Sequence, residues 1–252
     1  MFRILTLYLA KDSINKKRYD SVRLQKGVEQ KIIVVSAKKI EIPNNLVVEV
    51  PEKYPLPIRV GLSINYALQA YWSPKKYDYL FKIDNDVLIK PNYIFHLISK
   101  NRPIIGPGCA MLIDGRFFEK KYGNRWPICY CDDMYMKAYA FTLDFIEDIW
   151  EKDLMPIVYE YNPENYKEYI YGKEYYKFGA PFWYICIHLI ASVKNFLLRR
   201  PDRIPFVGSI YCFAGYLSEF GKAKYKWHRN FSEKLTKKYI KKFSKLPLME
   251  RV

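Results

Sequence analysis

The fold is decided by residues 77–91, which read YDYLFKIDNDVLIKP. The aromatic and aliphatic run at 79–83 has the composition of a buried β-strand. Asp84 and Asp86 follow it, and side chains at positions i and i+2 of an extended chain point to the same side. Two like charges at this spacing repel each other unless a cation or hydrogen bonds lie between them. The pair therefore indicates either a divalent metal that carries a phosphorylated substrate, which the buried strand favours, or a solvated acidic turn.

The segments around this strand alternate between strand-like and helix-like patterns. Buried strands are predicted at 2–10, 31–36 and 46–50. Helices are predicted at 11–27, 59–72 and 92–100. A further strand is predicted at 103–113, where Gly106 and Gly108 indicate a bulge or a close backbone approach. This order predicts an α/β fold whose mostly parallel sheet is covered by helices on both faces.

The sequence changes character after residue 150. We expect a first domain at 1–150, an irregular segment rich in Tyr, Glu and Lys at 151–179, and a helical, basic extension at 180–252.

The extension contains two apolar runs, at 181–198 and 204–217. Neither predicts a transmembrane helix, which needs roughly twenty apolar residues without interruption. A basic amphipathic helix follows, with Asn230 expected as its cap and Phe231 and Leu235 on its apolar stripe. Such an extension fits either an anionic membrane surface or helices packed on the first domain with a solvated lysine face. Because the apolar runs and the basic helix occur together, the sequence favours membrane contact.

The formal net charge of +16 implies an anionic partner, which could be nucleic acid, a membrane surface or a phosphorylated small molecule. Half of this charge, a net +8, falls in residues 219–252. The five cysteines lack the spacing of a redox or zinc pair, so they are expected to be reduced and buried. We find no signal-peptide pattern, and together these features predict a cytoplasmic protein.

A second acidic pair, Asp132 and Asp133, stands where an apolar run gives way to a helix-like pattern. Carboxylates at a helix N-terminus are favoured by the helix dipole, so the pair could be an ordinary cap. Its position after the first acidic pair and after a glycine-bearing strand favours a chemical role instead.

With these residues identified, the chain resembles the family 2 glycosyltransferases of GT-A fold. The matching segments read RVGLSINYAL at 59–68, YDYLFKIDNDVLIKPNYI at 77–94, GPG at 106–108 and DD at 132–133. The resemblance covers about residues 3–145 and is most specific in the middle block. Residues 200–217 show a looser likeness to the C-terminal extension that many of these enzymes carry.

The resemblance implies a metal-dependent, inverting glycosyltransferase that moves a sugar from a UDP- or GDP-sugar to a hydroxyl group of a glycan, a lipid-linked sugar or a protein. It implies a GT-A domain followed by an acceptor-side segment and a helical extension. Asp86 and Asp84 would bind Mn²⁺ or Mg²⁺, while Asp133 would be the general base and Asp132 would orient the acceptor. The residues expected to contact the nucleotide-sugar are Asp84, Arg59, Asn65, Lys82 and Ser36.

Two positions depart from the family pattern. The second strand ends in Val35 and Ser36 rather than in the acidic cluster that usually grips the nucleotide base. No histidine clearly completes the metal shell: His228 is a candidate, but the sequence favours a surface histidine at this position.

Two other functions remain open. The first is a basic, non-catalytic protein that binds nucleic acid, which we do not expect because the excess charge lies in the tail and RNA-binding and zinc patterns are missing. The second is an enzyme of the same fold that makes sugar nucleotides or transfers phosphate.

Overall fold

The computed structural model describes residues 1–147, 158–159, 165–198 and 206–244. The chain divides into two compact units, Met1–Tyr161 and Asn162–Val252, and each unit is described by itself.

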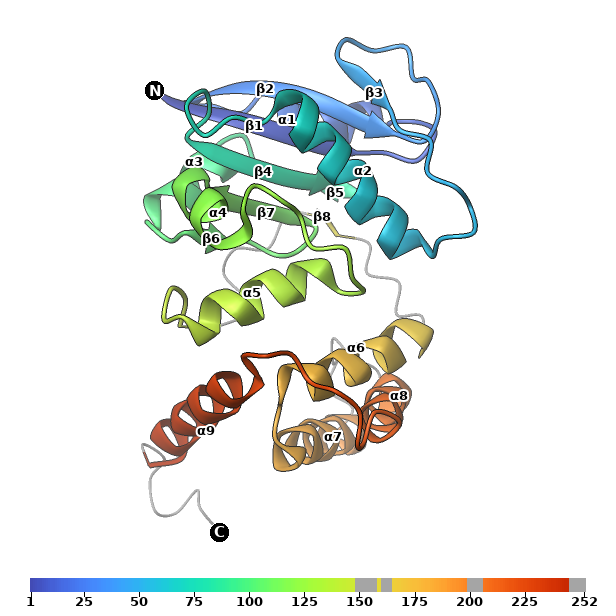
Figure 1. The fold of residues 1–252 in the computed structure, drawn as a ribbon, viewed down its shortest axis with the longest axis vertical. Coiled ribbons are helices and arrows are strands. Elements are labelled where there is room, and N and C mark those ends of the chain that lie inside the picture. Colours follow the sequence, from blue (N-terminus) through green and yellow to red (C-terminus); the bar gives the residue numbers. More distant parts are fainter. Residues whose placement is uncertain (148–157, 160–164, 199–205, 245–252) are drawn as a thin grey trace. The chain divides into compact units, whose positions relative to one another are not determined.

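The first unit is built on a six-stranded sheet with the order β3-β2-β1-β4-β7-β6 (Figure 1). Its strands are β1 (Phe2–Leu9), β2 (Val28–Ser36), β3 (Asn45–Val47), β4 (Tyr79–Asp84), β6 (Ile104–Ile105) and β7 (Ala110–Asp114). β1 runs parallel to β2 and β4, and β2 runs parallel to β3, whereas β7 is antiparallel to β4 and β6. The prediction of an α/β fold with a mostly parallel sheet is confirmed, and the acid-bearing strand β4 lies in the middle of that sheet.

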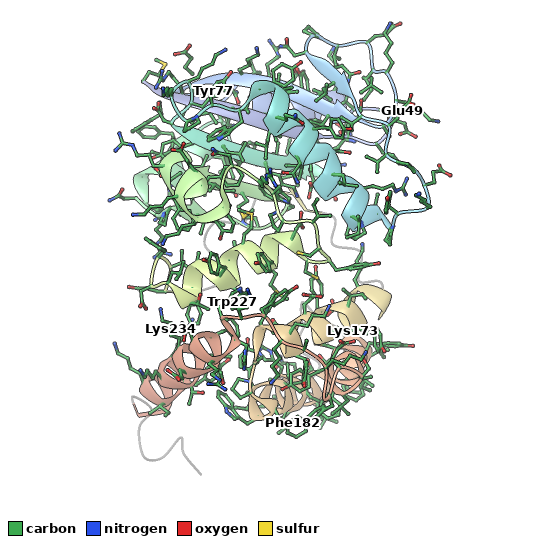
Figure 2. The ribbon with its side chains drawn as sticks, viewed as in Figure 1. Glu49, Tyr77, Lys173, Phe182, Trp227 and Lys234 are labelled. Carbon is green, nitrogen blue, oxygen red and sulfur yellow. The ribbon has the colours of Figure 1, made fainter. Side chains whose placement is uncertain are left out.

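The two edges of the parallel strands are chemically different. Figure 2 labels Tyr77, which precedes β4 at the N-terminal edge, and Glu49, which follows β3 at the carboxyl edge. At the carboxyl edge, β4 continues into a short β5 (Val87–Leu88), which pairs with β8 (Val158–Tyr159). This edge is where ligands bind in open α/β sheets.

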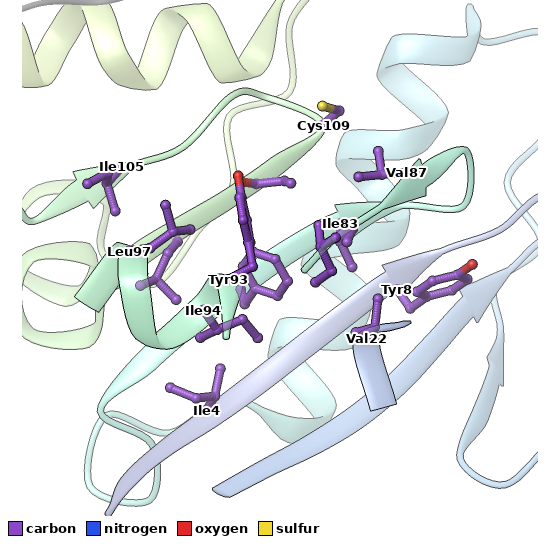
Figure 3. Close-up of a cluster of buried hydrophobic side chains, with 14 of the residues drawn as sticks. Ile4, Tyr8, Val22, Ile83, Val87, Tyr93, Ile94, Leu97, Ile105 and Cys109 are labelled. Carbon is purple, nitrogen blue, oxygen red and sulfur yellow. The ribbon is translucent and has the colours of Figure 1, made fainter. Parts of the chain in front are cut away.

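Both faces of the sheet are covered, because residues 4–8 of β1 are all buried although successive side chains point to opposite faces. On one face, Ile4 and Tyr8 join a hydrophobic cluster with Val22 of α1 (Lys16–Arg23) and Ile94 of α3 (Tyr93–Ser99) (Figure 3). Beside the sheet's other face, α2 (Leu56–Tyr71) contacts β1 and β2, and α4 (Gly115–Tyr122) follows β7.

Three predicted elements of the first unit are wrong in extent. The strand expected at 46–50 ends at Val47 as β3. The helix expected at 11–27 is shortened to α1, because the side chain of Asn85 hydrogen-bonds to Ser13 and Asn15 and holds the preceding loop extended. The strand expected at 103–113 is divided into β6 and β7. The turn between them depends on Gly106, whose φ of 92° lies in the region that favours glycine.

The second unit contains α6 (Asn165–Phe178), α7 (Phe182–Leu197), α8 (Phe206–Leu217) and α9 (His228–Ser244). The irregular segment predicted between 151 and 179 is wrong where the structure describes it, since α6 occupies most of it; residues 151–157 and 160–164 lie outside the described part. Asn230 is not a cap, because α9 begins two residues earlier. The apolar stripe is confirmed: Phe231 and Leu235 are buried. No described helix combines the length and the hydrophobicity needed to cross a bilayer.

The cysteines are less buried than the sequence predicted. Cys109 is buried, but the other four are only half-buried.

Helices α6 and α8 approach each other through glycines on both partners. A Cβ atom added at Gly172 of α6 would lie 1.8 Å from the carbonyl oxygen of Cys212, and one added at Gly215 of α8 would lie 1.9 Å from that of Tyr169. Both of these carbonyl oxygens belong to the backbone, which cannot rotate out of the way as a side chain could. The spacing of these two helices therefore depends on the absence of a side chain at both positions.

We predict that Gly172→Ala lowers the free energy of unfolding of the second unit by about 3 kcal/mol or more, because a methyl group would displace backbone. The matched control is Gly221→Ala, where no atom lies within 4 Å and only the positive φ opposes the change, at about 1–2 kcal/mol. Denaturant unfolding followed by circular dichroism measures both. Equal losses in the two variants would contradict the close contact.

Candidate active site

The β4–β5 turn carries Asp84 and Asp86 and is fixed by backbone hydrogen bonds on both sides. The Asp84 N–H donates to the Cys109 carbonyl at 2.9 Å, and the Asn85 N–H donates to the Leu9 carbonyl at 3.0 Å. The first acidic pair is thus held between the end of β1 and the start of β7, and the buried Cys109 and Val87 belong to the hydrophobic cluster (Figure 3).

Asn85, between the two aspartates, is a positioning residue that the sequence did not single out. Its Oδ1 accepts from the Tyr8 hydroxyl at 2.7 Å and from the Asn15 N–H at 3.2 Å. Its Nδ2 donates to the Ser13 carbonyl at 3.2 Å. The amide therefore ties the turn to the β1–α1 loop. In the sequence, Asn85 is visible only as a polar residue between two carboxylates. That pattern fits a solvent-exposed residue as well as one that fixes the turn.

Lys82 supplies the cation that the acidic pair requires. Its side chain is buried, and its Nζ lies 2.6 Å from Asp84 Oδ1 and donates to the Gly108 carbonyl at 2.8 Å. Burial lowers the pKa of Lys82, but the carboxylates around it, chiefly Asp84 and then Asp132 and Asp133, outweigh burial and raise the pKa above its ordinary value. The lysine is therefore charged at neutral pH.

The second acidic pair begins α5 (Asp132–Thr142), as predicted. Asp132 Oδ2 accepts from the Trp126 indole N–H at 2.5 Å, and its Oδ1 accepts from the Asp133 backbone N–H at 3.0 Å. Burial, with the nearby charge of Asp133, raises the pKa of Asp132 to about 6, and Lys82 opposes this rise. An ordinary exposed helix cap would not be perturbed in this way.

Gly108 is the point where the two acidic pairs meet. A Cβ atom at this position would lie 1.6 Å from Asp133 Oδ2, so the carboxylate occupies the space beside the glycine backbone. The Gly108 carbonyl accepts the hydrogen bond from Lys82. Burial raises the pKa of Asp84, the charges of Asp86 and Asp133 raise it further, and the charge of Lys82 lowers it. The close backbone approach predicted at this glycine is confirmed, and both acidic pairs converge at the carboxyl end of β4.

Asn65 and Ser36 are occupied by contacts within the protein. Asn65 donates from Nδ2 to the Trp126 carbonyl at 2.9 Å and accepts from the Trp126 N–H at 2.8 Å. It therefore positions the residue that binds Asp132. Ser36 donates to the Lys38 carbonyl at 2.6 Å and accepts from Asn45 at 2.7 Å, which secures β3 against β2.

Two buried side-chain atoms lack a hydrogen-bond partner in the part of the chain that the structure describes. They are Arg59 Nε and Asp86 Oδ1. Leaving a buried polar group unsatisfied costs about 1–3 kcal/mol, and more for a charged group, so each such atom requires an explanation. Both atoms belong to residues for which the sequence predicted a ligand contact. A bound ligand would supply the missing hydrogen-bond or metal partner.

The donor set fits a divalent ion that shares its ligands with a substrate. Within the described ranges, no group of three or more His, Cys, Asp or Glu side chains is arranged to hold a metal ion. His228 belongs to the second unit, where its Nδ1 lies 3.0 Å from the Tyr225 carbonyl oxygen. Mg²⁺ is commonly bound by one or two carboxylates together with substrate phosphates, so a complete protein cage is not required. The unpartnered oxygen of Asp86 suits that arrangement.

No protein-family model matches this chain, and a search of curated proteins finds no significant match.

We predict that Asp132 makes stability fall as pH rises between about 4 and 6. Its folded pKa of about 6 exceeds the ordinary value of 3.8, so the folded state binds more protons in this window. Replacing it by Asn removes that dependence, and Asp132→Asn should gain up to about 3 kcal/mol relative to wild type across the window.

Denaturant unfolding at a series of pH values measures this slope. Asp78→Asn is the control with the opposite sign, because hydrogen bonding to Arg3 lowers the pKa of Asp78 and its stabilising effect is lost as pH falls. A pH-independent difference between Asp132→Asn and wild type would contradict the prediction.

Proposed function

We propose that this chain is a metal-dependent, inverting glycosyltransferase of GT-A type, which transfers a sugar from a UDP- or GDP-sugar to an acceptor hydroxyl group. The observation that carries the proposal is the convergence of Asp86 and Asp133 on Asp84, which is paired with Lys82, at the carboxyl end of β4. Glycosyl transfer requires one carboxylate site for the departing diphosphate and another for the acceptor proton. Two acidic pairs in one cluster supply both.

Asp86 is the principal ligand of Mn²⁺ or Mg²⁺ in this proposal, because its Oδ1 is buried without a partner. When bound, the ion would act as a Lewis acid on the diphosphate leaving group. Asp84 is already paired with Lys82, which orients it and leaves it to contact the nucleotide ribose or the same ion. The sequence predicted that Lys82 contacts the nucleotide-sugar. Because its ammonium group already binds Asp84 and the Gly108 carbonyl, we assign the diphosphate to another residue.

Arg59 is the residue we assign to the diphosphate. Its Nε is the other buried, unpartnered polar atom, and a guanidinium group is well suited to binding phosphate. Gly61 and Asn65 on the same helix lie against the 126–128 segment that leads to the second acidic pair. Arg59 lies two residues before Gly61, about 200° around the helix, and so on a different side of α2. Its assignment to the diphosphate therefore rests on its buried, unpartnered Nε.

Asp133 is the general base. As the acceptor oxygen forms its bond to the anomeric carbon, the O–H proton passes to the Asp133 carboxylate. The bond between that carbon and the phosphate oxygen breaks on the opposite face, and the nucleoside diphosphate leaves with the electron pair. Asp132 does not contact the reacting atoms in this scheme: it binds Trp126 and the Asp133 N–H and so orients the start of α5.

We expect at least one UDP- or GDP-sugar to be turned over in the presence of Mn²⁺, with Asp86→Asn reducing turnover about 10²–10³-fold and chelation reproducing the loss. Asp78→Asn is the matched control, since it lies at the opposite end of β4, about 20 Å away at the rise of a strand.

Product analysis separates the alternatives. A glycosylated acceptor supports the proposal, whereas release of phosphate or formation of a sugar nucleotide supports another enzyme on the same fold. Nucleic-acid binding with steep salt dependence and without metal-dependent turnover would favour the non-catalytic alternative.

We expect Asp133→Asn to bind the donor as wild type does but to lose transfer by about 10²–10⁴-fold, the usual contribution of a general base. Gly108→Ala should produce a similar loss without altering any carboxylate, because its methyl group would displace Asp133. Calorimetric titration of the donor and single-turnover transfer measure the two effects. If Asp133→Asn transfers sugar at the normal rate, Asp133 is not the base.

A further inference from the structure

Helix α8 has one face packed inside the second unit and an opposite face that is exposed and apolar. Gly208, Gly215 and Tyr216 are buried, and Gly215 lies against the backbone of α6. The opposite face follows helical spacing, and its large side chains are 41–50% exposed: Val207, Ile210, Tyr211 and Leu217. The sequence of α8 contains no charged residue. Its exposed face therefore presents mainly hydrocarbon and lacks the charged side chains of an ordinary surface helix.

Helix α7 enlarges this surface. It packs on α8 through the stacked rings of Phe196 and Phe206, 5.3 Å apart, and through the contact of Phe182 with Phe213. Phe182 is itself about half exposed, and its position is labelled in Figure 2. Further exposed apolar side chains of the same helix and its C-cap are Ile190, Phe196, Leu197 and Leu198. Contiguous apolar patches of this kind mark interaction sites on soluble proteins.

A run of cations adjoins the apolar face. Phe220, 58% exposed, follows α8, and after it come four exposed basic residues: Lys222, Lys224, Lys226 and Arg229. Residues 162–252 contain 18 Lys and Arg against 7 Asp and Glu, a net charge of +11, whereas the remaining residues carry +5 of the total +16. Apolar side chains bordered by cations match a surface with hydrocarbon below and anionic groups above.

We propose that α7 and α8 bind the surface of an anionic lipid bilayer, with their exposed apolar side chains inserted at the level of the headgroups and the 222–229 cations on lipid phosphates. The helices have 16 and 12 residues, or about 24 and 18 Å at the helical rise, and so lie in the interface rather than across a hydrocarbon core of roughly 30 Å. Two copies of this unit would repel each other through like charges, and a nucleic acid would leave the apolar side chains exposed. A membrane satisfies both features.

The experiment is co-flotation of the full chain with vesicles of phosphatidylcholine alone or mixed in equal parts with phosphatidylserine. Wild type should bind the mixed vesicles and release them at high salt. Ile210→Asn combined with Leu217→Asn should weaken binding at least about tenfold, because two half-buried hydrocarbon groups are lost from the interface. Lys226→Ala combined with Arg229→Ala should weaken binding to the mixed vesicles roughly thirtyfold.

The matched control combines Leu24→Asn with Val47→Asn, two exposed apolar residues of the first unit, and should bind as wild type does. Circular dichroism verifies folding, and the charge variant, which alters only exposed residues, gives an independent result if the apolar variant does not fold. The proposal is overturned if wild type fails to bind mixed vesicles, or if the charge variant binds them as tightly as wild type. It is also overturned if sedimentation shows a dimer that the apolar variant dissociates while neither protein binds vesicles. None of these measurements uses a nucleotide-sugar, so their failure would leave the proposed reaction intact.

Discussion

The buried ion pair between Lys82 and Asp84 is the interaction on which the candidate site depends. Deleting one partner of a buried pair typically costs 3–5 kcal/mol, because the other charge is left uncompensated. Here the cost would extend further, since the same ammonium group also interacts with Asp132 and Asp133. One lysine is nevertheless too little to neutralise the three carboxylates around it and Asp86, which lies near Asp84. Burial and the charge of Asp133 together raise the pKa of Asp132, and Asp86 keeps one buried oxygen without a partner. A divalent ion would reduce the excess negative charge.

The ion pair also connects the sheet to the helix that carries the second acidic pair. Lys82 is fixed by β4, its hydrogen bond fixes the carbonyl of Gly108, and the bare backbone of that glycine admits the carboxylate of Asp133. Uncharged amides support the same arrangement from outside: Asn85 holds the β4–β5 turn, and Asn65 holds Trp126. The charged residues at the centre are thus held in place by neutral side chains around them. Such support keeps the two carboxyl sites at a fixed separation.

Sequence patterns predicted the elements with strong periodicity and missed what depends on contacts distant in the chain. The α/β order and the helix after Cys131 followed from apolar runs and glycine positions. The shortened α1 did not, because its loop is held by Asn85, about seventy residues away. The sequence identified Lys82 as a basic residue of the site but not Asp84 as its partner. A lysine can bind a diphosphate or an aspartate, and only the folded strand shows which of the two lies beside it. The helix at 165–178 was missed because its Tyr, Glu and Lys residues give little amphipathic contrast.

The distribution of charge bears on which anion the site can bind. The positive excess of the chain lies mainly in residues 162–252, whereas the candidate site is locally acidic. Three carboxylates surround Lys82, Asp86 adds a fourth beside Asp84, and Arg59 is the additional cation we assign to the site. A phosphate group approaching these carboxylates directly would be repelled. In the proposed reaction, a bound metal ion would offset this local negative charge and allow the diphosphate to bind. The proposed site would therefore suit a diphosphate that brings its own metal ion better than the backbone of a nucleic acid, which basic side chains bind without a metal.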